Sequence, residues 1–346
     1  NFCGTDLLPP VPHADAADLV GPRRPDRGNE ARRSVSSVGG GCELITLAID
    51  SDQELVGLFG GDTEATLGYL GTLMAATSSI YTRDHGIRLQ ASYIRLWIGE
   101  DPWNAGGTAD ELYAFRDLWR AEMAWVQRDL AHFLSGRGLG GGVAWLPGLC
   151  GDYGYGLSAN LNGSFPYPVE NNSSQNWDLM VFAHELGHNV GCPHTHDIGV
   201  DNCAGGDCTV TPNGTIMSYC HLCGGGMSNM RMEFHPQVQS VIINYLETGI
   251  SCELAGDGSP PVAVADIVPT LLGETVDISV LANDYTNDCS QAMLDTWDTV
   301  SNDGLPVELV DDDVELALFR YAAPTESADS GDIFNYSIID ASGQPD

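Results

Sequence analysis

The chain contains 346 residues and carries a formal net charge of −34, from 48 acidic residues and 14 basic residues that are all arginine. A surface this acidic repels nucleic acid and anionic membranes, so neither is an expected partner. The length favours two domains, and no apolar stretch approaches the ~20 residues that a membrane-spanning helix needs. A salty habitat, a calcium-rich exterior and simple compositional bias all remain open as reasons for the acidity.

Residues 1–41 have the composition of an N-terminal tail or prosegment remnant rather than of a domain. Five prolines fall within residues 9–25, and five of the fourteen arginines fall within residues 23–33. The sequence starts at Asn1 with no signal-peptide pattern, so we expect a trimmed chain or a fragment.

From Cys42 the pattern becomes globular, with strand and helix signals in alternation. A short apolar run over residues 44–49 predicts a buried strand, and near-helical spacing over residues 62–82 predicts a helix. Residues 87–98 alternate and predict a second strand. Helical spacing returns over residues 108–134, so we expect one long helix there.

Residues 136–142 contain a pattern similar to the G-x-G-x-x-G phosphate loop, which we reject. No strand leads into it, and residues 143–146 after it have the pattern of a strand instead of a helix whose N-terminus could hold phosphate. Residues 153–160 then alternate aromatic or apolar residues with small ones, which predicts a further strand.

Residues 175–190 form the most informative segment, a predicted helix that carries His184, Glu185 and His188. Histidines four positions apart lie on one face of an α-helix, so both imidazoles can reach one metal ion. Glu185 follows the first of them and flanks the metal without binding it. A carboxylate in that place can take a proton from a metal-activated water.

Gly191 is expected to end this helix, because glycine readily adopts the left-handed backbone that reverses the chain. Pro193 reinforces the stop, and His194 then arrives as a third nitrogen ligand. Three protein ligands with one open position are typical of a catalytic zinc site. His196 is a weaker alternative to His194. A last helix is expected over residues 236–247.

Beyond the helix over residues 236–247, the composition changes. Residues 255–261 are rich in glycine and proline and mark a linker. Residues 276–280 and 334–338 alternate apolar with polar residues, which predicts an all-β sandwich over residues 262–346 that is truncated at its end. Asp311–Asp313 could hold a structural Ca²⁺, although a solvated loop explains the same run.

His184–His194 matches the metzincin zinc-peptidase signature H-E-x-x-H-x-x-G-x-x-H at every fixed position, and residues 215–219 resemble its methionine turn. Residues 142–146 and 153–158 resemble the adamalysin (reprolysin) branch, particularly its secreted bacterial relatives. The sandwich similarly resembles bacterial immunoglobulin-like or cadherin-like repeats. One departure from adamalysins is that Thr195 and His196 separate the third histidine from Asp197.

The resemblance implies an α/β (α+β) catalytic domain over residues 42–254, with a mixed twisted sheet and long helices that include the zinc helix. It further implies a secreted, monomeric zinc metalloendopeptidase that acts on proteins or peptides, with Zn²⁺ as its cofactor. The ligands would be His184, His188 and His194, with Glu185 as general base.

Several further roles rest on the resemblance alone. Met217 would form an apolar floor beneath the imidazoles. Tyr219 would bind the metal or stabilise the oxyanion, as in the astacin and serralysin branches. Tyr155, Gly156 and Leu157 would lie in the edge strand at the upper rim of the cleft, where an extended peptide adds antiparallel.

Ten cysteines indicate disulfides and an oxidising, extracytoplasmic setting. Cys220-x-x-Cys223 resembles half of a zinc knuckle, but no matching second pair exists. By analogy with adamalysins, Cys150 is expected to pair with Cys252. Cys3–Gly4 could be a cysteine switch, in which a thiolate occupies the open zinc position of a latent proenzyme.

The prosegment would then be cut at Arg32–Arg33. An ordinary disulfide at Cys3 is the alternative. For the whole chain, the rival interpretation is a catalytically inactive metalloprotease-like protein used for binding or adhesion, against which the intact Glu185 argues.

Overall fold

The structure, a computed structural model, describes the first domain almost completely and the second in part. The described residues are 3–5, 8, 43–252, 254, 260–266, 268, 270–282, 284, 286, 292–310, 314, 317–324, 332–341 and 343–346. The hypotheses on Arg32–Arg33 and Asp311–Asp313 lie outside them, as does most of the predicted linker.

The chain divides into two compact units, one containing Ile45–Glu253 and the other containing Leu254–Asp346. Among the described residues, no helix is long and apolar enough to cross a membrane.

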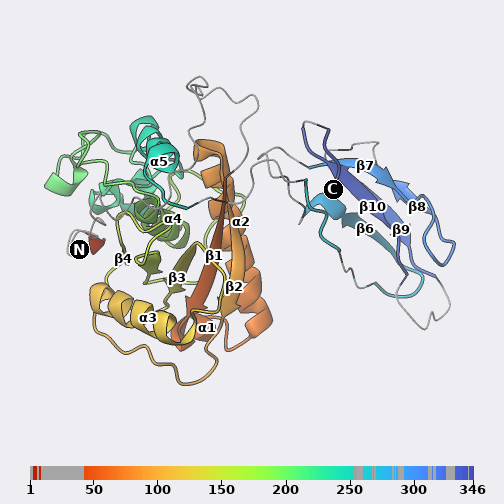
Figure 1. Ribbon diagram of the computed structural model, residues 1–346, viewed down its shortest axis with the longest axis horizontal. Coiled ribbons are helices and arrows are strands. Elements are labelled where there is room, and N and C mark those ends of the chain that lie inside the picture. The colour runs from red at the N-terminus through yellow and green to blue at the C-terminus, as the bar shows by residue number, and fades with distance from the viewer. Residues whose placement is uncertain are drawn as a thin grey trace, which may run out of the picture. The chain divides into compact units, whose positions relative to one another are not determined.

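The first unit is built on a five-stranded mixed sheet in the order β2-β1-β3-β5-β4 (Figure 1). β1, β3 and β5 are parallel to one another, and β4 adds antiparallel to β5. The strands are β1 (Glu43–Ser51), β2 (Ile87–Arg95), β3 (Leu130–Leu134), β4 (Gly142–Ala144) and β5 (Tyr155–Ser158).

This order corrects the expectation that Tyr155–Leu157 form the edge strand. β5 lies between β3 and β4, and β4 is the edge. All four residues of β5 are buried, because the strand has a neighbour on each side and helices contact it. Alternation within one strand does not reveal which neighbours it will have.

The helices of the first unit are α1 (Gln53–Gly57), α2 (Thr63–His85), α3 (Thr108–Glu122), α4 (Trp177–Asn189) and α5 (Pro236–Thr248), with 3₁₀ turns η2 (Cys203–Gly205), η3 (Cys220–Leu222) and η4 (Gly226–Asn229). The predicted helices over residues 62–82, 175–190 and 236–247 are confirmed as α2, α4 and α5. α2 is capped at its start by Asp62, whose side chain accepts hydrogen bonds from two N–H groups of the first turn, and at its end by Gly86, which has a φ of 67°.

The single long helix predicted over residues 108–134 is wrong in its second half. α3 stops at Glu122, and the segment continues into β3, where every residue is buried. A strand buried on both faces is apolar at each position, so its periodicity does not separate it from a helix.

Helices cover both faces of the sheet. Successive side chains of β3 point to opposite faces, so they contact different helices. The Phe133 ring lies 5.5 Å from that of Phe115 in α3. The neighbouring His132 points to the other face, where its ring lies 4.9 Å from Phe182 in α4. The helix that carries the zinc motif therefore packs against the side of the sheet opposite α3.

Among the described residues, three disulfides lie in the first unit. Cys150 pairs with Cys252, as predicted. The cysteines near the proposed site form Cys203–Cys220 and Cys208–Cys223, which confirms disulfides over a zinc knuckle. Cys3 and Cys192 are free and buried.

The described strands of the second unit form two antiparallel sheets, β10-β7 and β6-β9-β8, with Val280–Ala282 (η5) after β6. They are β6 (Thr275–Ser279), β7 (Met293–Trp297), β8 (Val307–Leu309), β9 (Leu318–Ala322) and β10 (Tyr336–Ile339). Phe319 lies in their shared core, with Trp297 and Phe334 against it.

Candidate active site

α4 is anchored at its N-terminal end by Asp178, which is fully buried. The Tyr69 hydroxyl donates to its carboxylate at 2.8 Å, and the backbone N–H groups of Asn162, Gly163 and Ser164 donate to it at 2.9–3.2 Å. Burial raises the pKa of Asp178, and these donors act against the rise. The carboxylate thereby ties the start of the zinc helix to α2 and to the loop after β5.

Two backbone carbonyls orient the histidines of α4. Nδ1 of His184 lies 2.7 Å from the Ile216 carbonyl oxygen, and Nδ1 of His188 lies 2.7 Å from that of Cys192. A ring that donates from Nδ1 presents the lone pair of Nε2 to a metal. Both rings are therefore set as nitrogen ligands.

His194 reaches the same point because α4 ends where the sequence predicts. Gly191 has a φ of 87°, and the N–H of Cys192 donates to the Gly187 carbonyl at 2.9 Å. The chain then turns, and the centroid of the His194 ring lies 4.6 Å from that of His188 and 5.3 Å from that of His184.

Asp197 reaches back to His194 across the two residues that depart from the adamalysin pattern. Its Oδ2 lies 3.4 Å from Nδ1 of His194 and accepts a hydrogen bond from the His194 backbone N–H at 3.2 Å. The ring of His196 stacks on that of His194, with centroids 5.0 Å apart and an angle of 7°. The inserted residues thus support the third histidine instead of displacing it.

The methionine turn supports the zinc helix and the third histidine through packing and backbone contacts. Met217 is fully buried, and a Cβ added at Gly187 would lie 2.6 Å from its sulfur. The Met217 carbonyl accepts hydrogen bonds from both the N–H and the hydroxyl of Thr195, at 3.1 and 3.2 Å. The Tyr219 hydroxyl lies 3.1 Å from Nε2 of His194, on the metal-facing side of the ring.

The chemistry of this donor set fits a zinc ion. One ligand atom each from Cys3, His184, His188 and His194 lies within 4.8 Å of the others, and all four residues are buried. Burial and the neighbouring imidazoles lower the pKa of His184 and His188 well below the ordinary value, so both rings are neutral at physiological pH. Neutral imidazoles with a thiolate or water are the ligands that zinc prefers in proteins.

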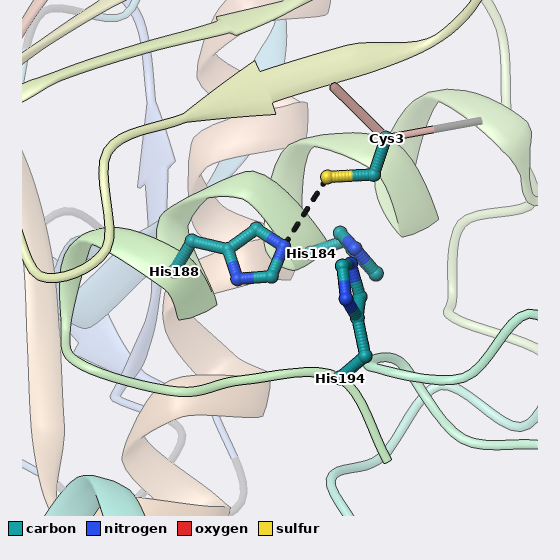
Figure 2. A group of neighbouring side chains, drawn as sticks. All are labelled: Cys3, His184, His188 and His194. Atoms are coloured by element: carbon teal, nitrogen blue, oxygen red, sulfur yellow. Dashed lines mark hydrogen bonds between the residues drawn. The ribbon is translucent and has the colours of Figure 1, made fainter. Parts of the chain in front are cut away.

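Cys3 lies directly at this centre (Figure 2). Its sulfur is 3.3 Å from Nε2 of His188 and 3.5 Å from Oε2 of Glu185. Without a metal, burial and the Glu185 charge raise the pKa of the thiol. A bound zinc ion would reverse this, because thiols that coordinate zinc are deprotonated.

The residues after Cys3 run along the open edge of β4. Cys3 forms a parallel bridge with Gly142, and the Gly4 N–H donates to the Gly142 carbonyl at 2.9 Å. The Thr5 hydroxyl donates to the Ala144 carbonyl at 3.0 Å and accepts from the Ala144 N–H at 3.3 Å. The Cys3 thiol also donates to the Thr5 hydroxyl, at 3.1 Å.

The structure therefore brings together the three predicted histidines, Glu185, Tyr219 and Cys3. It does not bring Tyr155, Gly156 and Leu157 to an open rim, because they lie in the covered strand β5. Sequence reasoning missed Thr5 and Gly142, since neither residue type in a tail or a glycine-rich turn carries a chemical signal.

Comparison with known proteins gives a family. Residues 43–231, more than half of the chain, match the model of Metallo-peptidase family M12. The chain is 25% identical over 169 residues to the rat "Disintegrin and metalloproteinase domain-containing protein 1", a match that covers 46% of this chain and 20% of the rat protein.

A solved structure titled "Structure of a chaperone-substrate complex" has 17% identity, a TM-score of 0.38 and a match over 59% of this chain and 34% of its own. The chain thus spans about a fifth of the length of the rat relative and about a third of that structure. The family match covers α4 with its three histidines and the methionine turn. The chain belongs to Metallo-peptidase family M12.

Proposed function

We propose that the chain is a secreted zinc-dependent endopeptidase that hydrolyses peptide bonds in proteins or peptides. The observation that carries this proposal is the convergence of three buried imidazoles beside the carboxylate of Glu185. Family membership and three disulfides support a peptidase that works in an oxidising, extracytoplasmic setting.

His184, His188 and His194 would hold the ion through Nε2. When bound, zinc polarises the scissile carbonyl and lowers the pKa of a water toward ~7. Glu185 takes a proton from the attacking water and delivers it to the departing amine nitrogen. Tyr219, whose hydroxyl already lies at His194, is proposed to bind the metal or to donate a hydrogen bond to the developing oxyanion.

We further propose that Cys3 keeps this form of the chain latent. Its thiol lies among the three histidines, at the position where the reacting groups of a substrate would meet. The segment that carries it also pairs with the edge strand that an extended substrate would join. Removal of the thiol would open the first of these places, and removal of the segment would open both.

The direct test is cleavage of casein by the full chain carrying Cys3→Ser, with and without a chelator. We expect chelator-sensitive cleavage that Zn²⁺ restores, at a rate well above that of the unsubstituted chain. Equal rates in both chains would remove the latency proposal alone. A variant that binds zinc in equimolar amount but cleaves neither casein nor a mixed peptide library would favour the alternative of a binding or adhesion protein.

The fold class of the second unit was predicted from the alternation of apolar and polar residues in its strands. We propose that it is a bacterial immunoglobulin-like or cadherin-like domain, supported by its two antiparallel sheets and common core.

A further inference from the structure

The side chain of Glu185 lies directly over Gly142, the first residue of the edge strand. A Cβ added at Gly142 would stand 2.6 Å from Cδ of Glu185 and closer still to its Cγ and Oε1. Real Cβ atoms do not approach other heavy atoms this closely, so no larger residue fits while Glu185 keeps its place.

The backbone of each partner is held in place, so the Glu185 carboxylate is the group that an added Cβ would displace. Gly142 is held in β4 by its antiparallel pairing with Ser158, and Glu185 is fully buried on α4, whose start is anchored by Asp178. The φ of Gly142 does not lie in the left-handed region, so its backbone conformation does not require glycine. The requirement for glycine there is therefore a requirement for space.

We propose that Gly142 is a positioning residue for the general base. Its bare Cα forms the surface against which the Glu185 carboxylate rests, which fixes the base relative to both the histidines and the edge strand. The inference rests on the proposed peptidase function and adds a residue that sets its geometry. One backbone position thus aligns the strand expected to hold the substrate with the group that activates water.

The activity test uses the full chain with Cys3→Ser as background. Adding Gly142→Ala should lower kcat at least tenfold with KM within twofold, because the base is displaced while the substrate contacts remain. Gly138→Ala is the matched control, since nothing lies within 4 Å of a Cβ added there, and it should leave kcat unchanged. An unchanged kcat in Gly142→Ala overturns the proposal.

A stability cycle tests the same contact without activity. Gly142→Ala should lower the melting temperature by at least about 3 °C when Glu185 is present and by less than about 1 °C in the Glu185→Ala chain, where the Cβ has room. An equal drop in both chains would show that Glu185 is not the neighbour that matters, and would overturn the proposal. If the Cys3→Ser chain shows no peptidase activity at all, the proposed function fails while this cycle still reports on the contact.

Discussion

At the scale of single residues, the spacing of the histidines was sufficient to predict that three imidazoles meet at one point. Positions 184 and 188 share a helix face, and Gly191 has the left-handed backbone that the motif requires. The Asp197 contact was not predicted, and the place of Cys3 was raised only as a hypothesis from the affinity of thiolate for zinc. Cys3 reaches His188 across a separation of 185 residues, and no periodicity relates them.

Substitution of Glu185 by alanine should lower kcat by about 10²–10⁴-fold, the range typical of a lost general base. The three imidazoles remain, so zinc content should stay equimolar. The measurement is casein cleavage in the Cys3→Ser background together with metal analysis of the same sample. Cleavage at the undiminished rate would exclude Glu185 as the base.

Thr5 provides a separate test of latency. Its hydroxyl satisfies both backbone groups of Ala144, so Thr5→Val should weaken the hold of the segment by about thirtyfold, from two hydrogen bonds of about 1 kcal/mol each. The uncleaved variant should show more basal peptidase activity than the parent chain and less than Cys3→Ser.

Thr5→Ser is the matched control, because it keeps the hydroxyl and should keep the low activity. If Thr5→Val were as inactive as the parent, the pairing with Ala144 would contribute nothing to latency.

At the scale of elements, helices α2 and α5 and the zinc helix were predictable from the spacing of their apolar residues. Residues of β3 were predicted to be helical, and β5 was predicted to be the edge strand, which is β4. Both errors concern strands that are buried throughout, Leu130–Leu134 and Tyr155–Ser158, whose residue pattern does not reveal what packs beside them.

The anchor of α4 can be tested at this scale. Asp178→Asn should lower the free energy of unfolding by about 3 kcal/mol. The buried carboxylate accepts hydrogen bonds from Tyr69 and three backbone N–H groups. The NH₂ group of asparagine would face one of these donors and could not accept its hydrogen bond. Asp110→Asn, in the first turn of α3 and exposed, should change it by less than about 0.5 kcal/mol. Denaturant titration of both variants measures the difference, and equal effects would contradict the anchor.

At the scale of the molecule, length predicted two units, residue patterns and the resemblance predicted their classes, and the even cysteine count predicted disulfides. Composition could not predict how acid would act on the first unit, which depends on burial. Burial lowers the pKa of His132 to about 3, and its Nε2 lies 2.9 Å from the Ser158 hydroxyl.

The unfolded chain binds a proton at this ring below about pH 6.5, while the folded chain does not until about pH 3. His132 therefore lowers the stability of the folded state as pH falls from about 6.5, by roughly 1.4 kcal/mol per pH unit. Between pH 6 and 5, the free energy of unfolding should fall less steeply in His132→Gln than in the parent chain. The two slopes should differ by up to about 1.4 kcal/mol per pH unit. Parallel curves for the two chains would show that His132 does not carry the effect.

The central claim is that His184, His188 and His194 hold one zinc ion whose remaining position is open to water or to Cys3. Zinc X-ray absorption of the metal-loaded full chain tests it most directly. We expect three nitrogen ligands and one sulfur at about 2.3 Å, with oxygen in place of the sulfur in Cys3→Ser. Fewer than three imidazole nitrogens in either chain, or a sulfur ligand that persists in Cys3→Ser, would contradict the account.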